Sequence, residues 1–482
     1  YPAALVYGTM AGEVRTPSET FSALKRLSRQ CYILESLEDT EKRGRYTFLG
    51  YDPKLGIDCK DGVLNIRNGT ALTIETDDPG KYIRQIIAEN RTAPAPDLPP
   101  FTGGLVGYFA YDYIKYSEPS LNSEEADEEG FRDVDLMLFD KVIAYDHLEH
   151  NICLIANIKT DHLEENYNKA VDALKHLSRL IVDGEPAEMP PLRMTSEFRP
   201  LFDEARYCEM VKKAKTHIRE GDIFQVVLSN RLDADAEGSL FDTYRMLRRI
   251  NPSPYMFYFS SDDIEIAGAS PETLVKVRDG QVYTFPLAGT RPRGKTPEED
   301  LALEAELLSD PKELAEHNML VDLGRNDIGK VSAFGTVEVE RYKEIERYSH
   351  VMHIGSTVKG QMRADKSVTD AIDAVLPAGT LSGAPKIRAC EIISELENNK
   401  RGIYGGAIGY IGFSGEMDTC IAIRIAYKKN GKVFVRSGAG IVADSVPEKE
   451  FEECNSKMRA VVSALRYAEE EAALTAGEGG RG

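Results

Sequence analysis

The chain has 482 residues, 42% hydrophobic and 29% charged, an ordinary globular composition whose length suits two large domains better than one core. A formal net charge of −20 disfavours nucleic acids and acidic membranes as partners, and no apolar run reaches the roughly 18 residues of a membrane span. The N-terminal residues show no secretory signal, and the seven cysteines are scattered without a C-x-x-C pair, so we expect a cytoplasmic protein without structural zinc.

The first part of the chain mixes short β-rich runs with a few helices. We expect a helix over 164–180 and strands over 46–50, 63–66, 104–108, 136–144 and 152–158. The Pro-rich stretch from about Asp183 to Pro200 indicates a domain boundary. We therefore expect an N-terminal domain over 1–185, a linker over 186–200, a catalytic domain over 201–468 and a tail over 469–482. The tail is expected to be disordered from Thr475.

The second part repeats this mixture, with hairpin signals such as Asp279-Gly280 and Asn430-Gly431. Strands are expected over 224–232, 255–259, 264–269, 274–277, 282–287, 405–413, 419–426 and 433–437. Helices are expected over 202–220, 296–308, 311–323, 366–375, 384–397 and 447–469. Hairpin-rich sheets with helices in blocks predict an α+β fold of mixed or antiparallel sheets in a layered sandwich, rather than a doubly wound parallel sheet.

Residues 289–296 match the Walker A pattern of phosphate-binding loops letter for letter, which makes a P-loop nucleotide enzyme a remote alternative. Pro292 removes one of the N–H groups that such a loop aims at phosphate. The following helix opens with Glu298, Glu299 and Asp300, which would repel phosphate. A second pattern, G-x-G-x-x-A at 438–443, lacks the acidic residue about 20 positions later that a dinucleotide site needs.

Two predicted helices each carry a pair of glutamates three residues apart, Glu313 with Glu316 and Glu450 with Glu453. This spacing places both carboxylates of a pair on one helical face. Converging carboxylates without nearby cysteine are the ligands that Mg²⁺ prefers. The alternative is an ordinary solvated pair of helix faces.

Other residues near these helices could hold an anion or move a proton. The glycines at 437–441 are expected to form a loop whose N–H groups approach an anionic ligand. Arg424 interrupts the apolar strand 419–426, where it would need a carboxylate partner, and Lys457 follows Glu453 by one turn. His353 is a candidate for proton transfer, although a structural histidine is the commoner case.

Four long motifs occur in order along the second part: 286–294 (PLAGTRPRG), 316–327 (EHNMLVDLGRND), 379–386 (GTLSGAPK) and 436–447 (RSGAGIVADSVP). Together they resemble the chorismate-utilising enzymes, and most closely component I of anthranilate synthase. The resemblance is dense over 202–465 and thinner before it. It implies amination of chorismate at ring C2 by ammonia with loss of the C4 hydroxyl, followed by pyruvate elimination, with Mg²⁺ as Lewis acid.

The resemblance also assigns roles to individual residues. It places Glu316 and Glu453 as metal ligands, supported by Glu450 and Glu313. Lys457 matches a further substrate-side position. The matched chorismate contacts are Gly289, Thr290, Tyr404, Arg424, Gly438, Ala439 and Gly440. The matched residues for the chemistry are Glu272, which would protonate the departing hydroxyl, together with His353 and Thr380.

Two positions distinguish members of the family. Aminodeoxychorismate synthases commonly carry a nucleophilic lysine where this chain has Ala288, although some lack it, so this enzyme stays the alternative. Isochorismate and salicylate synthases carry a lysine base at the position of Gln225, and a neutral amide cannot take a proton. Direct attack by ammonia remains, which favours anthranilate synthase.

A regulatory site and a partner are also implied by the resemblance. Residues 33–36 and 251–256 resemble the two halves of a tryptophan-binding pocket, with Glu35, Ser36, Pro254, Tyr255 and Met256 as candidate contacts, so we expect feedback inhibition by L-tryptophan. The alternative is plain interdomain packing. No cysteine lies in a nucleophile-elbow context, so ammonia is expected from a separate glutamine amidotransferase subunit, in a complex such as a dimer of heterodimers.

Overall fold

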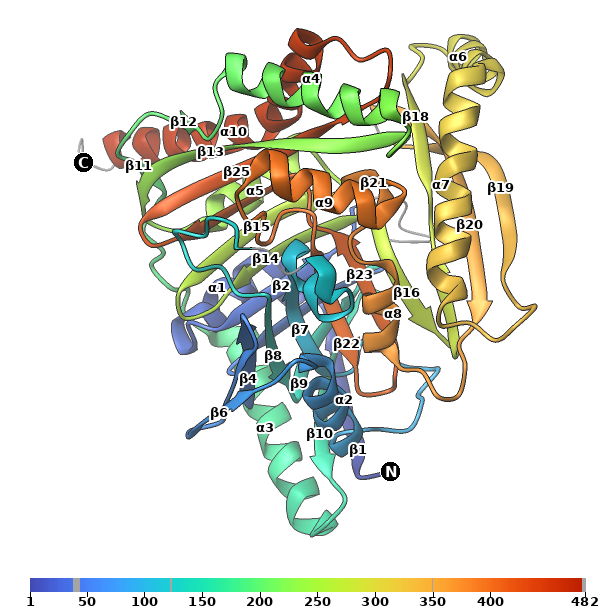
Figure 1. The fold of residues 1–482 in the computed structure, drawn as a ribbon. Helices are drawn as coiled ribbons and strands as arrows, with labels where there is room; N and C mark the ends of the chain where they lie inside the picture. Colours follow the sequence, from blue (N-terminus) through green and yellow to red (C-terminus); the bar gives the residue numbers. More distant parts are fainter. Residues whose placement is uncertain (38–43, 122–123, 349, 479–482) are drawn as a thin grey trace.

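Two large antiparallel sheets pack face to face, with helices on their outer faces (Figure 1). The structure is a computed structural model that describes residues 1–37, 44–121, 124–348 and 350–478, with side chains up to residue 474. A buried cluster that includes Tyr32, Phe139, Phe257 and Tyr427 fills the space between the sheets. The α+β layered fold expected from the sequence is confirmed.

The first sheet runs, in spatial order, through β1 (Ala3–Ala11), β10 (Asn151–Lys159), β9 (Lys141–Asp146), β3 (Tyr46–Tyr51), β2 (Cys31–Glu35), β14 (Tyr255–Ser260), β15 (Ile264–Ser270), β24 (Ile425–Lys429), β25 (Lys432–Ile441), β13 (Gln225–Glu237) and β11 (Arg193–Met194). Two short strands also pair with β13, namely β12 (Arg199–Pro200) and β21 (Gly383–Ala384). Strands β11 and β12 lie within or at the end of the Pro-rich stretch expected to be a linker.

The second sheet runs through β18 (Leu287–Pro292), β20 (Val351–Gln361), β17 (Gln281–Thr284), β16 (Thr273–Arg278), β23 (Met417–Ile421), β22 (Ala407–Gly412), β7 (Gly104–Phe109), β8 (Val134–Phe139), β4 (Leu55–Lys60), β5 (Val63–Arg67) and β6 (Ala71–Glu75), while β19 (Glu338–Arg347) pairs with β20. Each sheet combines strands from both parts of the chain. The two parts join where β2 pairs with β14 and where β7 pairs with β22, so they are intimately packed as the sequence predicts.

Helices cover the outer face of each sheet. Against the first sheet lie α1 (Pro17–Leu27), α3 (Leu163–Asp183), α4 (Glu204–Glu220), α5 (Phe241–Ile250), α9 (Lys386–Glu397) and α10 (Pro447–Glu478). Against the second lie α2 (Pro79–Glu89), α7 (Pro311–Gly329) and α8 (Val368–Val375), with α6 (Pro297–Ser309) beside α7. Short 3-10 helices occupy Gly12–Val14, Tyr111–Tyr116, Pro119–Leu121 and Gly379–Leu381.

The starts of α6 and α7 follow from local sequence. Thr296 and Asp310 accept hydrogen bonds from N–H groups of the first helical turn, and a proline follows each of them. Such a cap satisfies donors that the helix leaves free, and proline suits the next position because its missing N–H is not needed there. The glutamates at the start of α7 are therefore held at a well-defined helix end.

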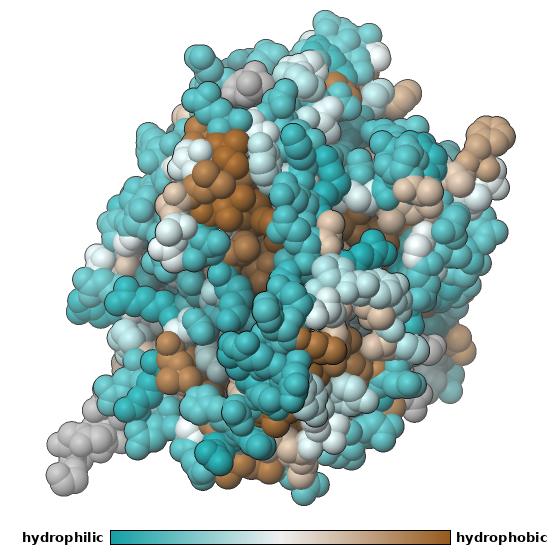
Figure 2. All heavy atoms as spheres, turned by 90° about the horizontal axis from the view of Figure 1, so that it is seen from below, coloured by the Kyte–Doolittle hydropathy of each residue, from teal (hydrophilic) through white to brown (hydrophobic). Residues whose placement is uncertain are grey.

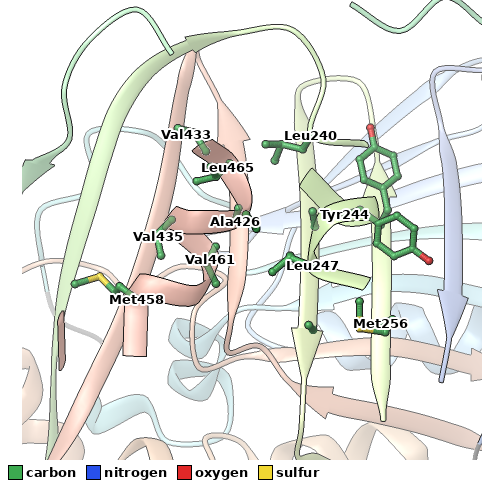
Figure 3. Packing of buried hydrophobic residues seen from close by; sticks show 14 of the residues in the cluster. Leu240, Tyr244, Leu247, Met256, Ala426, Val433, Val435, Met458, Val461 and Leu465 are labelled. Atoms are coloured by element: carbon green, nitrogen blue, oxygen red, sulfur yellow. The ribbon is translucent and has the colours of Figure 1, made fainter. Parts of the chain in front are cut away.

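Helices α5 and α10 are anchored on the first sheet by apolar packing (Figure 3). Val461 and Leu465 of α10 lie beside Val433 and Val435 of β25, and Leu247 of α5 belongs to the same buried cluster on the side of Met256. Fully burying a side chain of this size contributes about 1.5–3 kcal/mol relative to leaving it exposed. This packing fixes the helix that carries Glu450 and Glu453.

Four local expectations from the sequence are wrong. The expected strand 282–287 is the end of β17 and the start of β18, separated by 285–286. The runs 136–144 and 419–426 are each two strands, because the chain passes from one sheet to the other at Asp140 and at 422–424. Strands buried on both faces are continuously apolar, so no alternation marks the crossing. The segment 438–440 is part of β25 rather than a loop, since it pairs with 227–229 of β13. Helix α10 extends to Glu478, so the first residues of the expected disordered tail are helical.

The face seen from below is mainly hydrophilic, with apolar side chains gathered in separate areas (Figure 2). None of the helices in the described part of the chain is long and apolar enough to cross a membrane.

Candidate active site

Two segments in which the chain passes between the sheets lie side by side. One is Pro271–Glu272, between β15 and β16, and the other is 422–424, between β23 and β24. The N–H of Ile421 donates to the carbonyl of Glu272 at 2.9 Å, and that of Ala269 donates to the carbonyl of Arg424 at 3.1 Å. These bonds bring Glu272 and Arg424, which are far apart in the sequence, to one place.

Glu272 has the properties of an acid that works near neutral pH. The Thr380 hydroxyl, on the 3-10 helix Gly379–Leu381, donates to Glu272 Oε1 at 3.2 Å. Burial raises the pKa of Glu272 to about 7, against the opposing effects of the Thr380 bond and of Arg424. Arg424 itself has an exposed side chain and a left-handed backbone with φ 52°.

His353 contacts Gly289 and Thr290 at the point where the pairing of β18 with β20 changes register. The register of β18 against β20 shifts between Ala288 and Arg291, and Gly289 has φ 70°. His353 Nδ1 lies 2.8 Å from the Gly289 carbonyl oxygen and 3.1 Å from Thr290 Oγ1. Because a carbonyl only accepts, Nδ1 carries the hydrogen, and the neutral ring keeps its lone pair on Nε2. Burial lowers the pKa of His353, so this neutral form predominates at pH 7.

The two glutamate pairs face one another from α7 and α10. Burial raises the pKa of Glu316, and the carboxylates of Glu313 and Glu453 add to this effect. Burial also raises the pKa of Glu450, again with a contribution from Glu453. Such mutual effects between two helices arise only when the carboxylates share one small region.

Lys457 contacts both this region and residues 437–441 at the end of β25, which are called the glycine strand below. Its ammonium group pairs with Glu453 at 2.7 Å and donates to the Gly438 carbonyl oxygen at 3.2 Å. Glu453 and Lys457 are each about half exposed, at 51% and 50% of the side chain, so this end of the region is open to solvent.

The carboxylate oxygens of these four glutamates do not all lie within 4.8 Å of one another. Among the described residues, the group of side chains whose ligand atoms lie within 4.8 Å of one another is His217, Glu220 and Asp222, elsewhere on the surface. The all-carboxylate donor set of α7 and α10 nevertheless fits Mg²⁺, because this ion binds through one or two carboxylates and keeps several waters. Burial raises the pKa values of Glu316 and Glu450 and the carboxylate of Glu453 adds to both effects, so a bound cation would favour their charged forms.

Gly438 and Gly440 keep space open along β25. A Cβ at Gly438 would lie 3.0 Å from the Tyr404 hydroxyl oxygen, and one at Gly440 would lie 2.8 Å from Gln225 Nε2. The pairing of β24 with β25 ends at Val435, and in the described chain no strand covers residues 437–441 on that side. The backbone of Gly438, Ala439 and Gly440 therefore has no strand partner on that side in the described chain, although Ala439 is fully buried and Gly440 is partly exposed.

The predicted residues form one site rather than two. Besides the bond from His353, Gly289 contacts the glutamates, since a Cβ on it would lie 3.2 Å from Glu313 Oε2. Tyr404 and Lys457 both reach Gly438 from the other side. Arg424 acts on the pKa of both Glu272 and His353, and His353 in turn bonds Gly289 beside Glu313, so the two groups lie in one neighbourhood.

Comparison with known proteins shows the family of the chain. The sequence pattern of the chorismate binding enzymes matches residues 30–463. The chain belongs to this family.

Several relatives cover nearly the whole chain. The anthranilate synthase component 1 of Acetivibrio thermocellus is 48% identical, over 95% of this chain and 94% of that protein. Its counterpart in Acinetobacter calcoaceticus is 46% identical over the same shares. The crystal structure of anthranilate synthase component I from Streptococcus pneumoniae aligns with a TM-score of 0.77 at 37% identity, over 94% of this chain and 98% of that one. The motif resemblance stated from the sequence is confirmed.

More distant members share the fold. The menaquinone-specific isochorismate synthase MenF from Escherichia coli aligns with a TM-score of 0.71 at 18% identity, over 96% of this chain and 94% of that one.

The structure also explains why the Walker-like segment is not a phosphate loop. Strand β18 continues through Pro292, and the N–H groups that follow are already taken. Gly294 N donates to Asp300 Oδ1 at 2.7 Å and Lys295 N to Glu299 Oε2 at 2.8 Å. The acidic first turn of α6 occupies the donors that a phosphate would need.

The candidate tryptophan contacts lie together at the junction of the two parts. Glu35 pairs in register with Met256, and the N–H of Leu37 donates to the Ser253 carbonyl beside Pro254. Ser36 Oγ and Asn251 Nδ2 are buried and make no hydrogen bond within the described chain.

The register of the first sheet connects this junction with the candidate active site. Tyr255 pairs with Ser270, two residues before Glu272, and its hydroxyl donates to Asp418 Oδ1 at 2.7 Å. The junction is therefore linked to the candidate active site through adjacent strands.

One group of residues escaped the sequence analysis. Glu397, Arg401 and Arg436 form a buried ion cluster directly behind Tyr404 and Thr380. An arginine within the apolar strand 433–437 was the available signal, because such a residue must find a partner inside the protein.

Proposed function

We propose that the chain is the large subunit of an anthranilate synthase, which aminates chorismate at C2 with ammonia and then eliminates pyruvate. The observation that carries the proposal is the near-full-length similarity to proteins named anthranilate synthase component 1. The site agrees with it, because the side chain beside Gly440 is the neutral Gln225 and the residue before Gly289 is Ala288. Neither can act as a base or a nucleophile, so ammonia attacks directly.

In this proposal the departing C4 hydroxyl takes its proton from Glu272. At pH 7 about half of a group with a pKa of about 7 is protonated, which suits a general acid. Thr380 fixes the direction of the carboxyl group through its hydrogen bond. His353, with its lone pair on Nε2, can accept a proton from the attacking ammonia or from the ring.

Cationic and main-chain groups hold the dianionic substrate. Arg424 supplies positive charge near Glu272 and Lys457 supplies it near Glu453, and the substrate would contact Gly289, Thr290 and the β25 backbone at Gly438–Gly440. Tyr404 presents its hydroxyl to this strand. Together these groups orient the ring so that C2 is open to attack and C4 faces Glu272.

Mg²⁺ would be held by Glu316, Glu453 and Glu450, with Glu313 supporting them. When bound, the ion would polarise the ring carboxylate and offset the repulsion between a dianion and an acidic site. The support for this assignment is the carboxylate donor set and the raised pKa values of Glu316 and Glu450.

Partner, inhibitor and compartment complete the proposal. The relatives' designation as component 1 implies a second component, which we take to be a glutamine amidotransferase subunit in a dimer of heterodimers. L-Tryptophan would bind at Glu35, Ser36 and 254–256 and inhibit the reaction through β14 and β15. The complex would work in the cytoplasm.

Product identification tests the proposal. The purified chain with chorismate, Mg²⁺ and ammonium salt should produce the fluorescence of anthranilate, and glutamine should replace ammonium only after the amidotransferase is added. Release of 4-amino-4-deoxychorismate would instead identify an aminodeoxychorismate synthase. Hydrolysis of ATP that is lost in Lys295→Ala would overturn the assignment altogether.

A further inference from the structure

A cluster of buried charges lies behind the candidate active site. Arg401 and Arg436 are 1% and 2% exposed and share the carboxylate of Glu397, the last residue of α9. Arg401 Nη2 lies 2.7 Å from one carboxylate oxygen and Arg436 Nη2 lies 2.8 Å from the other. Two guanidinium groups and one carboxylate leave a net positive charge in the core, which is costly unless every N–H finds an acceptor.

The two arginines use their remaining N–H groups differently. Arg436 donates from Nε to Ser229 Oγ at 2.9 Å and from Nη1 to Asn399 Oδ1 at 2.8 Å. Ser229 pairs with Gly438 across β13 and β25, so Arg436 also supports the glycine strand, but its hydrogen bonds do not reach the Thr380 turn. Arg436 therefore joins β25 to β13 and to the segment after α9.

Arg401 contacts three elements of the candidate active site at once. It donates to the carbonyl oxygens of Leu381 at 2.6 Å and Val227 at 2.7 Å. Leu381 directly follows Thr380, and Val227 pairs with Gly440 across β13 and β25.

Two aromatic rings also contact the Arg401 guanidinium group. Its Cζ lies 4.6 Å from the ring centre of Tyr111 and 5.8 Å from that of Tyr404. Because Tyr404 points its hydroxyl at Gly438, Arg401 also touches the support of the glycine strand.

We propose that Arg401 is a positioning residue that holds the Thr380 turn, the strand opposite Gly440 and the Tyr404 ring in the fixed relation that catalysis requires. This inference deepens the proposed function and rests on it. Arg401 acts through its neighbours, since the charged group that acts on Glu272 is Arg424 and the bond to Glu272 comes from Thr380. A planar fork of donors is needed, because an ammonium group cannot reach Glu397, Leu381 and Val227 together.

The test compares Arg401→Lys with Arg436→Lys. Both variants weaken a buried contact to the same Glu397, so both should melt at a lower temperature than the wild type by a similar amount. Arg436→Lys should lose little kcat, because the hydrogen bonds of Arg436 do not reach the Thr380 turn. Arg401→Lys should lose about tenfold to a hundredfold, because small misplacements of reacting groups have effects of this size. In that variant the alkaline limb of the pH–rate profile should move to higher pH, since losing the Thr380 bond raises the pKa of Glu272 further.

Equal kinetic losses in the two variants, or an unmoved pH profile in Arg401→Lys, would overturn the inference. If the wild type releases a product other than anthranilate, the proposed function fails, while the same comparison on that product still decides the role of Arg401. Chorismate affinity measured by calorimetry with Mg²⁺ gives a readout apart from turnover, and it should fall further in Arg401→Lys than in Arg436→Lys.

Tyr111→Leu provides a second variant if Arg401→Lys does not fold. It removes the Tyr111 ring, one of the two rings that contact the guanidinium group, and leaves the ion pair with Glu397 intact. A loss of about twofold to tenfold in kcat, with the same upward shift of the alkaline limb, would support the inference. Unchanged kinetics in a folded Tyr111→Leu protein would refute it.

Discussion

The carbonyl oxygen of Glu272 accepts a hydrogen bond from the N–H of Ile421 at 2.9 Å. Ser270 adds a second link, since its hydroxyl donates to the Ile421 carbonyl at 2.7 Å. Both bonds join the segments in which the chain leaves one sheet for the other. Both sheets therefore hold Glu272 and Arg424 in place, which would let a catalytic group on a connecting segment keep its direction.

The pH dependence of the rate should report Glu272. Because its pKa is about 7 and the protonated form is the active one, the rate should fall as the pH rises through 7, by tenfold per unit well above it. Initial rates of anthranilate fluorescence between pH 6 and 9, at constant free ammonia, give the profile. Glu272→Gln should abolish this limb and lower the rate by about 10²–10⁴.

Glu416 offers a control for this measurement. Its pKa is also raised, chiefly by burial, but it lies in the turn between β22 and β23, at the opposite end of β23 from Ile421. Glu416→Gln should leave the profile unchanged. A rate independent of pH in the wild type would show that Glu272 is not the acid.

The sequence allowed better predictions of the chemistry of individual residues than of the path of the chain. The glutamate spacing on α7 and α10 and the failure of the Walker-like segment follow from local rules, because helix faces and capped first turns depend on neighbours in the sequence. The meeting of Glu272 with Arg424 depends on two crossings between sheets. Those crossings lie inside runs that are apolar on both faces, so nothing local marks them.

Gly438 and Gly440 are a second case in which neighbours distant in the sequence decide the local structure. Glycine favours loops in general, yet here it lies in β25 because Tyr404, Gln225 and the β13 backbone come too close for a side chain. Those neighbours are distant in sequence. The buried Arg401 was missed for the same reason, since its partners Leu381 and Val227 offer only main-chain carbonyls, which no residue pattern reveals.

Mg²⁺ should stabilise the wild type and not Glu316→Gln. A ligand that binds only the folded state adds about 2.7 kcal/mol at one hundred times its dissociation constant, so the melting temperature should rise with Mg²⁺. Burial and neighbouring carboxylates raise the pKa of Glu316 in the folded state, so its charge at pH 7 disfavours folding without the ion. Glu316→Gln should therefore melt at or above the wild-type temperature in the absence of Mg²⁺, and respond weakly to it.

Glu452→Gln is the matched control, since Glu452 is an exposed neighbour of Glu453 on α10. It should keep both the activity and the response to Mg²⁺. A Glu316→Gln protein that melts well below the wild type without the ion would indicate that the carboxylates serve the fold and not a metal.

Ser36→Ala should weaken inhibition by tryptophan without loss of stability. The Ser36 hydroxyl is buried and has no hydrogen-bond partner in the described chain, so removing it takes away no contact within the protein. If it binds the charged amino-acid group of tryptophan, the inhibition constant should rise by about tenfold or more. Inhibition curves and calorimetric titration with tryptophan measure this change.

Ser253→Ala serves as the comparison, because the Ser253 hydroxyl donates to the Asn251 carbonyl at 3.1 Å. This variant should lose about 1 kcal/mol of unfolding free energy. Unchanged inhibition in Ser36→Ala, or a failure of the wild type to bind tryptophan, would leave these residues as packing between the two parts.

Glu397→Gln should destabilise the fold more than any surface change on α9. It leaves the guanidinium groups of Arg401 and Arg436 buried without a counter-charge, a change that costs about 3–5 kcal/mol, measurable by urea unfolding. Glu395→Gln, at an exposed position of the same helix, should stay within about 0.5 kcal/mol of the wild type.

The difference in unfolding free energy between the wild type and Glu397→Gln should depend on pH, which gives an independent check. Burial alone would raise the pKa of Glu397, but the two guanidinium groups outweigh it and hold the pKa below its ordinary value of 4.5. A carboxyl with a lowered folded pKa contributes stability above its unfolded pKa and loses it as the pH falls through the folded value. The gap between wild type and Glu397→Gln should therefore be constant near neutral pH and shrink below about pH 4. A gap that is small at pH 7, or that widens in acid, would show that the carboxylate does not hold the two arginines.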